Sequence, residues 1–349
     1  EDQVEKIFDK VHGGKNLIKR GHFGRYAHDK ALIVRSGKDC VKVLTGSTNF
    51  SITGLYVNSN HVLVFDDETV AGWYGDIFDA VWDEDVNRAK FLDTEWSKDT
   101  YPKDAKGQHL DSKTPATDFT FSPHDKAFST TLLDGIVTRI EKEGSKGVSK
   151  GSVLFAVMQI DGEGNPVYTA LNALHKDQNV FSYGISDKPD GIYLYPIAKR
   201  DGVLVTGKPV DTQLPPPFNQ VPNIGGIGHQ IHHKFVVCGF NRDDAVVYCG
   251  SSNLALGGEQ ENGDNLLAIH DKDIATVFAI EALSLVDHFD FLDRYSQNKT
   301  ESDKLAGPVA NLEDAAAKEG WFLSTTDDWK NKYYDPHDLH CADRELFST

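Results

Sequence analysis

Two stretches of the sequence place the same polar residues at the two ends of an apolar hairpin pattern. The stretches "HDKALIVRSGKDCVKVLTGSTNFS" (28–51) and "HHKFVVCGFNRDDAVVYCGSSNLA" (232–255) each begin with His-x-Lys and end with Gly-Ser-x-Asn. Histidine and asparagine are 21 positions apart in both. Imidazoles attack or carry protons, ammonium groups neutralise anions, and amides orient oxygens. We therefore treat the repeated set as a candidate active site.

Each stretch predicts a β-hairpin that brings its polar ends together. Apolar strands are expected at 31–34 and 40–47 in the first copy, and at 235–238 and 245–251 in the second. Antiparallel pairing places the entry and the exit of a hairpin at the same end. The residues expected to converge are His28, Lys30, Ser47 and Asn49, and likewise His232, Lys234, Ser251 and Asn253.

The repeat extends beyond the hairpins. Asn60 follows His28 by 32 positions, and Asp264 follows His232 by the same distance, each just before an apolar strand. A helix is predicted after each strand, at 69–82 and 273–292. The chain thus contains two copies of one α/β unit.

These motifs resemble the phospholipase D superfamily, whose mark is His-x-Lys followed by Gly-Ser-x-Asn, present twice. The His-Asp-Lys of the first copy is similar to the small bacterial endonucleases of that superfamily. The layout with two copies in one chain is more similar to its bilobal phospholipases. The resemblance implies an α/β fold of two similar lobes, each a mixed β-sheet flanked by helices, with one active site between them.

The resemblance also implies a reaction, in which a phosphodiester is hydrolysed or transferred through a phosphohistidine. One of His28 and His232 attacks phosphorus and the other donates a proton to the leaving oxygen. No metal and no other cofactor is required, because side chains supply the positive charge. The residues expected to hold the non-bridging oxygens are Lys30, Lys234, Asn49 and Asn253, with Ser47 and Ser251 as supporting contacts.

The acidic and amide residues of the repeat suggest different roles for the two histidines. Asp264 is expected to hold His232, and Asn60 to hold His28, each within its own copy. A carboxylate stabilises an imidazolium more than an amide does. The pattern therefore favours His232 as the general acid and His28 as the nucleophile, which agrees with the usual assignment in the family.

The sequence departs from the family pattern seven residues after each histidine. Arg35 and Gly239 stand where the fuller pattern has aspartate. The tyrosyl-DNA phosphodiesterase branch also lacks this aspartate. The Gly-Ser-x-Asn-Phe-Ser motif at 46–51 is not usual in that branch, so we rank the resemblance to that branch below the resemblance to the phospholipases.

Segment lengths predict two lobes of unequal extent. We place the first lobe at 1–92, a polar linker at 93–117, and the second lobe with a C-terminal tail at 118–349. The second lobe has 111 residues from Phe121 to its motif histidine, whereas 27 residues precede the first motif. We expect the first lobe to be incomplete at its N-terminus, with an N-terminal fragment as a possible partner.

Other histidines and the cysteines offer weaker sites. His124 and Lys126 repeat the His-x-Lys spacing without a Gly-Ser-x-Asn, and we expect them to be structural. His229, His232 and His233 could suggest zinc, but no matching cysteine or carboxylate set accompanies them. The four cysteines favour buried thiols, with one disulfide as the alternative.

Overall charge bears on the substrate. The net charge of −17, from 36 basic and 53 acidic residues, opposes non-specific nucleic-acid binding. Together with the resemblance to the bilobal phospholipases, this charge makes phospholipid the leading substrate, a nuclease the second hypothesis, and a non-catalytic phosphate-binding module the third. A lipid substrate calls for apolar residues at the mouth of the site, for which Phe218 and Trp321 are candidates.

Two irregular segments and the location of the protein are less determined. The stretch 207–230 is interpreted as an active-site loop, and the tail 321–347 could pack across the cleft. No apolar run approaches the ~20 residues of a membrane span. The first ten residues do not read as a signal peptide, and we lean toward an extracytoplasmic location.

Overall fold

The computed structural model describes two lobes and the connection between them. The described residues are 6–8, 10–11, 17–103, 110–111, 113–148, 151–158, 160, 164–174, 177, 180–186, 231–305, 326–337, 341, 344–345 and 348, with side chains of the last long helix described up to residue 288. The predicted loop 207–230, with Phe218 and His229, lies outside the described residues, as does Trp321.

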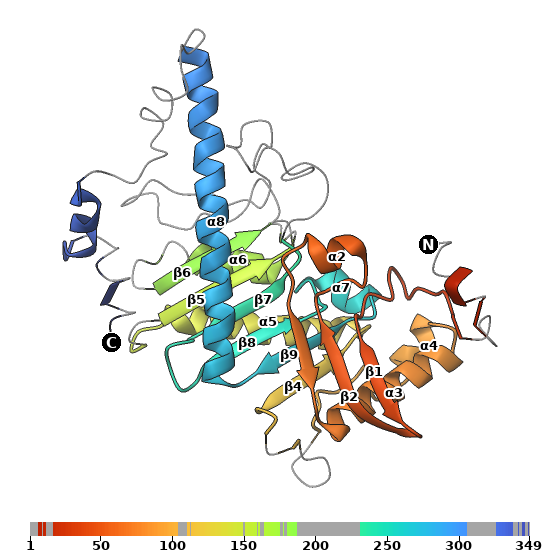
Figure 1. The fold of residues 1–349 in the computed structure, drawn as a ribbon. Helices are drawn as coiled ribbons and strands as arrows, with labels where there is room; N and C mark the ends of the chain where they lie inside the picture. The colour runs from red at the N-terminus through yellow and green to blue at the C-terminus, as the bar shows by residue number, and fades with distance from the viewer. Residues whose placement is uncertain are drawn as a thin grey trace.

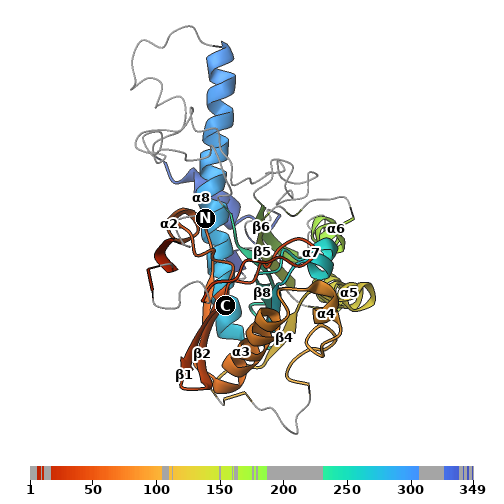
Figure 2. The same ribbon diagram turned by 90° about the vertical axis from the view of Figure 1, so that its right-hand side faces the viewer.

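The first lobe contains a small antiparallel sheet of order β1-β2-β3. Helix α3 contacts β1 and β2, and Figure 2 shows it beside these strands. The elements are β1 (Leu32–Ser36), β2 (Asp39–Gly46), α2 (Ile52–Tyr56), β3 (Val62–Phe65), α3 (Glu68–Asp83) and α4 (Arg88–Leu92).

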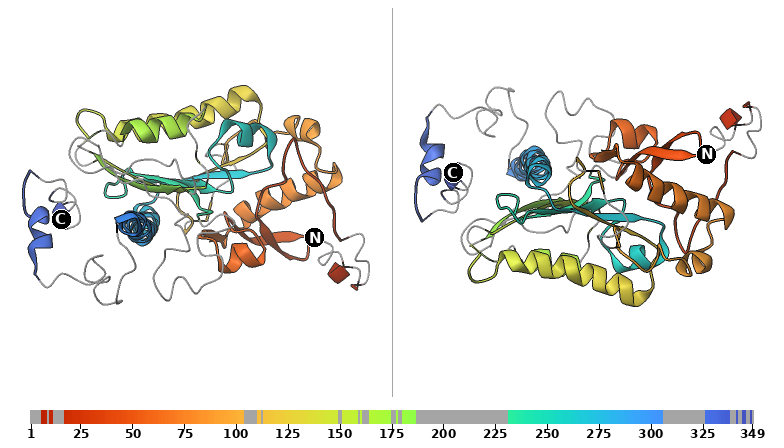
Figure 3. Two further views of the ribbon diagram at one scale, coloured as in Figure 1. Left: turned by 90° about the horizontal axis from the view of Figure 1, so that it is seen from above. Right: turned by 90° about the horizontal axis from the view of Figure 1, so that it is seen from below.

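The second lobe contains a larger mixed sheet of order β4-β9-β8-β7-β5-β6, in which β5 and β6 are parallel and the other pairs antiparallel. Helices α5 and α6 lie along one of its faces and α8 along the other (Figures 1 and 3). The elements are β4 (Thr117–Phe121), α5 (Lys126–Glu143), β5 (Gly151–Val157), α6 (Pro166–Leu174), β6 (Val180–Ser186), β7 (Lys234–Cys238), β8 (Val246–Gly250), α7 (Leu256–Glu261), β9 (Asn265–Ile269) and α8 (Lys272–Leu305).

Both predicted hairpins are present, and they share one register. Leu32 pairs with Leu44 in the first hairpin, and the residues 204 positions later, Val236 and Tyr248, pair in the second. The next strand pair agrees as well, because Gly46↔Val62 corresponds to Gly250↔Leu266. The two lobes are therefore built on one three-stranded unit, as the repeat predicted.

Helix α3 illustrates why the sequence folds as it does. The Asp67 side chain caps the helix by accepting hydrogen bonds from the backbone N–H groups of Thr69 and Val70. Apolar residues then follow at helical spacing and form one buried face. These residues are Val70, Trp73, Tyr74 and Ile77.

A single hydrophobic cluster joins the lobes. It contains Val43 and Phe65 of the first sheet together with Phe119 and Leu267 of the second. The predicted linker 93–117 takes part, because Tyr101 is 1% exposed and forms a backbone bridge to Phe119. The two lobes therefore share a core, which fixes their relative position.

The fold class is the predicted one, an α/β protein with two sheets flanked by helices. Within the described part of the chain, no helix combines the length and the apolar character needed to cross a bilayer.

Candidate active site

The glycine of each Gly-Ser-x-Asn motif is required by the backbone. Gly46 and Gly250 have φ values of 137° and 139°. A Cβ atom on Gly46 would lie 2.4 Å from the carbonyl oxygen of His61, and one on Gly250 would lie 2.5 Å from that of Asn265. Only glycine avoids this contact, and it lets the following serine turn into the site.

Each motif histidine is attached by its backbone to the opposite lobe. The His28 N–H donates to the carbonyl of Gly263 at 2.8 Å, and the Gly263 N–H donates to the carbonyl of Tyr26 at 2.8 Å. In the mirrored position, the His232 N–H donates to the carbonyl of Ser59 at 3.0 Å. The two lobes thus exchange the segments that carry the histidines.

The imidazole of His28 is held by a carboxylate. Its Nδ1 atom lies 2.6 Å from Oδ1 of Asp264, and the hydroxyl of Ser251 donates to the same oxygen at 2.8 Å. Asp264 is 2% exposed, so this interaction is shielded from water. Because Nδ1 of His28 is bonded to Asp264, Nε2 is the ring nitrogen left to contact a substrate.

The imidazole of His232 is held by neutral oxygens. Its Nδ1 atom lies 2.8 Å from Oδ1 of Asn60 and 2.9 Å from the carbonyl oxygen of Ser47. The Asn60 amide donates to the carbonyl of Gly54 at 2.9 Å, which fixes its oxygen toward the ring. The two oxygens accept, which favours the tautomer with the proton on Nδ1 and the lone pair on Nε2. The ammonium group of Lys234 lies 3.4 Å from Nδ1 and 3.5 Å from Nε2.

These contacts correct one expectation from the sequence. Asp264 holds His28 and Asn60 holds His232, so the expected pairing within each copy was wrong. The physical reason is the exchange of segments between lobes, which brings each histidine to the partner residue of the other copy. The argument that made His232 the better proton carrier therefore applies to His28.

Two lysines complete the centre of the site. Lys30 is 7% exposed and Lys234 is 0% exposed, and their ammonium groups donate to the carbonyls of His28 and His232, respectively. Burial lowers the pKa of Lys30 to about 8, although Asp264 and Asp29 oppose this shift. Burial and the charge of Lys30 lower the pKa of Lys234 to about 7.

The same charges act on His232. Burial, followed by the charges of Lys234 and Lys30, lowers its pKa to about 3. The charge of His28 contributes in the same direction. The structure therefore brings the two predicted sets together.

The two motif asparagines differ. Nδ2 of Asn49 lies 3.4 Å from Nε2 of His232, which suits an amide next to a lone pair. Oδ1 of Asn253 is buried with no hydrogen-bond partner among the described residues.

The sequence analysis did not identify a further set of polar residues near the two motif histidines. On the His28 side, the Asn265 amide donates to Oδ1 of Asp29 and to Thr45. Burial, then the charge of Asp264, raises the pKa of Asp29 to about 7. The sequence did contain a signal for these residues. Equivalent positions of the two copies are 204 residues apart, so Asp29 corresponds to His233 and His61 corresponds to Asn265.

On the His232 side, imidazoles occupy these two positions. The rings of His61 and His233 are stacked with their Nδ1 atoms 3.3 Å apart, and Nε2 of His233 lies 3.0 Å from Glu281 of α8. Burial lowers the pKa of both rings. No local sequence signal pointed to Glu281.

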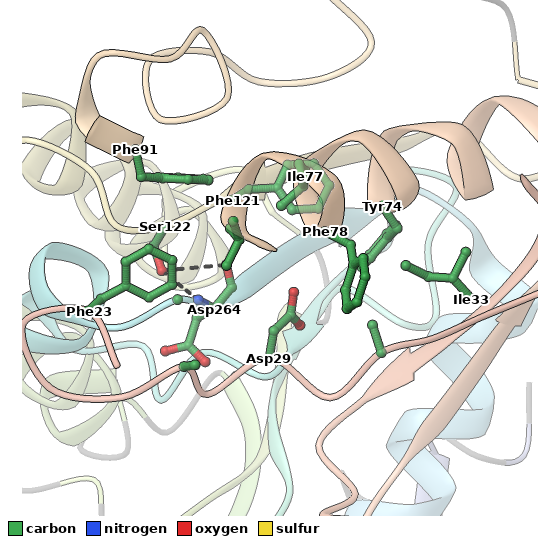
Figure 4. A pocket seen from close by; sticks show the side chains of 14 residues that line it. Phe23, Asp29, Ile33, Tyr74, Ile77, Phe78, Phe91, Phe121, Ser122 and Asp264 are labelled. Atoms are coloured by element: carbon green, nitrogen blue, oxygen red, sulfur yellow. Dashed lines mark hydrogen bonds between the residues drawn. The ribbon is translucent and has the colours of Figure 1, made fainter. Parts of the chain in front are cut away.

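A cavity of ≈ 250 Å³ lies behind the His28 side. Figure 4 shows the carboxylates of Asp29 and Asp264 at one part of its wall, with Phe78 and Tyr74 of α3 nearby. The rest of the lining is mostly apolar and includes Ile33 of β1. Oδ2 of Asp264 has no hydrogen-bond partner among the described residues.

The weaker candidates lie elsewhere in the fold. His124 is fully buried, with Nδ1 2.7 Å from the carbonyl of Ser97, as expected of a structural residue. Arg35 pairs with Asp79 at 2.8 Å, and Gly239 has a φ of 64°. All four cysteines are free thiols, and the described residues contain no cluster suited to a metal ion.

Comparisons with known proteins add a distant likeness. No family model matches the chain, and no curated protein matches it. Among solved structures, the chain is similar to polyphosphate kinase from Porphyromonas gingivalis, with a TM-score of 0.39 and 13% identity. The match covers 72% of this chain and 32% of that one. A likeness at this level carries no argument about function, so the site itself must carry it.

Proposed function

We propose that this protein cleaves phosphodiesters, or transfers their phosphoryl group, through a phosphohistidine. The observation that supports this most is the pair of buried lysines, Lys30 and Lys234, each bonded to the carbonyl of a histidine whose Nδ1 is already held. Burial disfavours both charges, and the charge of Lys30 also lowers the pKa of Lys234. A phosphate bound beside them would favour the charged form of both lysines.

The electrostatics favour His232 as the nucleophile. Attack on phosphorus requires a neutral imidazole with a lone pair on Nε2. His232 donates from Nδ1 to neutral oxygens and lies beside two lysines, so its neutral form is favoured. This proposal reverses the role expected from the sequence, because the partner residues are exchanged.

His28 is then the general acid and base. A carboxylate on Nδ1 stabilises the imidazolium form, which must exist before the leaving oxygen can be protonated. Ser251 supports this arrangement by donating to the same carboxylate oxygen. The lysines and the amides of Asn49 and Asn253 would hold the non-bridging oxygens as charge builds on them.

The steps balance without a further reactant except water or an alcohol. Nε2 of His232 forms a bond to phosphorus while the bond to the leaving oxygen breaks. The leaving oxygen takes the proton from Nε2 of His28. Neutral His28 then removes a proton from water, whose oxygen attacks phosphorus and breaks the P–N bond. The product is a phosphomonoester, and both histidines return to their first state.

The substrate class we propose is phospholipid. A lipid head group presents one phosphodiester to the site, whereas a nucleic acid presents a line of phosphates to the whole surface. A chain with a net charge of −17 repels the second kind of ligand more strongly. A nuclease therefore remains the competing hypothesis for the same chemistry.

Parallel assays separate these hypotheses. The protein would be incubated with phosphatidylcholine vesicles, single-stranded DNA and a p-nitrophenyl phosphodiester, and each reaction repeated with His232→Ala. We expect lipid cleavage that the variant abolishes. Cleavage of DNA alone would replace the lipid with a nucleic acid and keep the mechanism. Turnover of none of the three would support the phosphate-binding module instead.

A further inference from the structure

One face of the three-stranded sheet exposes several apolar side chains beside Lys42, which lies opposite Val34 and pairs with Asp66. Leu32 and Val34 alternate along β1 and therefore point to the same side. They belong to a group whose exposed fractions lie between 42% and 56%. The group consists of Leu32, Val34, Phe50 and Val62, which we call the outer face.

The residues 204 positions later show what covers such a face. Their exposed fractions are 4% or less. They pack in one cluster with Leu133 and Ile136 of α5 and Leu171 of α6. These residues are Val236, Cys238, Leu254 and Leu266. The same surface is thus buried in one lobe and open in the other.

The edge of β1 shows the same difference. Among the described strands, β1 pairs with β2 alone, so its other edge is open. Its counterpart β7 pairs on that edge with β5, where Phe155 lies opposite Val236 and Val153 opposite Cys238. An unpaired strand edge beside exposed apolar residues is a template for another strand.

The inner side of β1 adds a third observation. The cavity of ≈ 250 Å³ is lined by Ile33 of β1 and by Phe78 of α3 (Figure 4). In the second lobe, the helix corresponding to α3 is α8, which contacts β5 and β6. A strand added to β1 would direct alternate side chains to the cavity and to the outer face.

We propose that β1 and the outer face dock a polypeptide segment built like α5 and β5. Its strand pairs antiparallel with β1, and its amphipathic helix lies over Leu32, Val34 and Val62. The strand also covers the cavity that Ile33 and Phe78 line beside Asp29. This interaction goes beyond the proposed reaction and is independent of the roles of the histidines.

The test uses a synthetic segment with the sequence of residues 126–158, added to the full chain. Binding is measured by fluorescence anisotropy, and hydrogen exchange reports the amides of residues 32–36. We expect saturable binding and slower exchange in β1. A segment carrying Leu154→Pro should bind at least about tenfold more weakly, because proline removes a ladder hydrogen bond and resists the strand geometry.

Matched variants of the chain locate the binding surface. Val34→Lys places a charge on the outer face and should abolish binding without lowering the unfolding temperature, since Val34 is exposed. Val277→Lys, at an exposed apolar position of α8, should leave binding unchanged. Equal loss in both variants would overturn the proposal.

Other occupants of the surface would also be detected. Sedimentation of the chain alone as a dimer that Val34→Lys converts to a monomer would assign the face to a second copy. Vesicle binding that is lost in Val34→Lys but not in Val277→Lys would assign it to lipid. Either result, like absence of binding by the segment, contradicts the docking of a helix–strand unit.

Discussion

The two halves of the active site share a backbone but differ in charge. Ser47 and Ser251 make equivalent hydrogen bonds, to Asn60 on one side and to Asp264 on the other. The carboxyl groups of Asp264 and Asp29 lie on the His28 side of the site. The imidazoles of His61 and His233 lie on the His232 side. One backbone framework therefore carries two different electrostatic environments, with a carboxylate on Nδ1 of His28 and neutral oxygens on Nδ1 of His232.

The largest expected effect tests that assignment directly. A p-nitrophenyl phosphodiester has a leaving group that needs no acid, so nucleophilic attack can be observed alone. In His28→Ala we expect one equivalent of p-nitrophenolate and a phosphoryl adduct that accumulates on His232, because nothing activates water. Peptide mass spectrometry locates the adduct.

The reciprocal variant is the control. His232→Ala should give no burst of p-nitrophenolate and no adduct. An adduct on His28 in this variant, with none on His232 in the other, would restore the roles expected from the sequence.

The lysines should be the next most sensitive residues. Lys234→Met removes a buried counter-charge to the phosphate and should lower turnover on the order of a hundredfold or more, the scale of one lost oxyanion contact. Lys30→Met should have a similar effect. Turnover of the p-nitrophenyl substrate measures both.

Lys126 provides the matched control for these variants. It has the same His-x-Lys spacing but lies at the exposed start of α5. Lys126→Met should be nearly neutral. A loss as large as that of Lys234→Met would show that the wrong motif was chosen.

A further variant makes the His232 half of the site resemble the His28 half. Asn60→Asp places a carboxylate on Nδ1 of His232 and should raise the pKa of that imidazole by about 1–3 units. Below its pKa the imidazole is protonated and cannot attack. The acidic limb of kcat/KM should therefore move to higher pH, with less change at neutral pH.

Asn87→Asp serves as its control, because Asn87 caps α4 away from the site and aspartate caps equally well. Its pH profile should match that of the unchanged protein. An Asn60→Asp profile without a shifted acidic limb would contradict the role of His232 as nucleophile.

The smallest effect concerns stability. The pKa of Asp29 is raised from 3.8 to about 7 in the folded protein. The stability linked to its protonated form is full below pH 4 and is lost as the pH rises through 7. Asp29→Asn cannot ionise, so its unfolding temperature should exceed that of the unchanged protein at pH 8 and approach it at pH 4.

The corresponding residue of the other half should show the opposite sign. Burial lowers the pKa of His233, so the stability linked to its neutral form is lost as the pH falls. His233→Gln should therefore gain relative stability at acidic pH. The measurement is the unfolding temperature of each variant relative to the unchanged protein as a function of pH. If this difference changed with pH in the same direction for both variants, the two halves would not differ in charge as described.

The hairpins and their convergence could be predicted because they depend on local patterns. Alternating apolar residues and turn residues marked β1, β2, β7 and β8 to within two residues at each end. The antiparallel rule then brought His28 and Asn49 to one end of their hairpin. The repeat itself carried most of the information, because it showed which polar residues recur.

The partners of the histidines could not be predicted from the same information. Asp264 lies 236 residues from His28 in the chain, and the offset alone does not say whether a residue meets its own copy or the other one. The burial of Tyr101 in the predicted linker could not be predicted for a related reason. The composition of the linker is polar, and Tyr101 is buried by contacts with residues distant in sequence.

The exchange of segments between lobes has a consequence for the timing of synthesis. Translation proceeds from the N-terminus, so His28 leaves the ribosome well before Asp264, which orients its ring. At 5–20 residues per second the delay is roughly ten to fifty seconds. During that interval His28 lacks the carboxylate that orients its ring. In the proposed reaction, activity is therefore expected only after the second lobe has been made and docked.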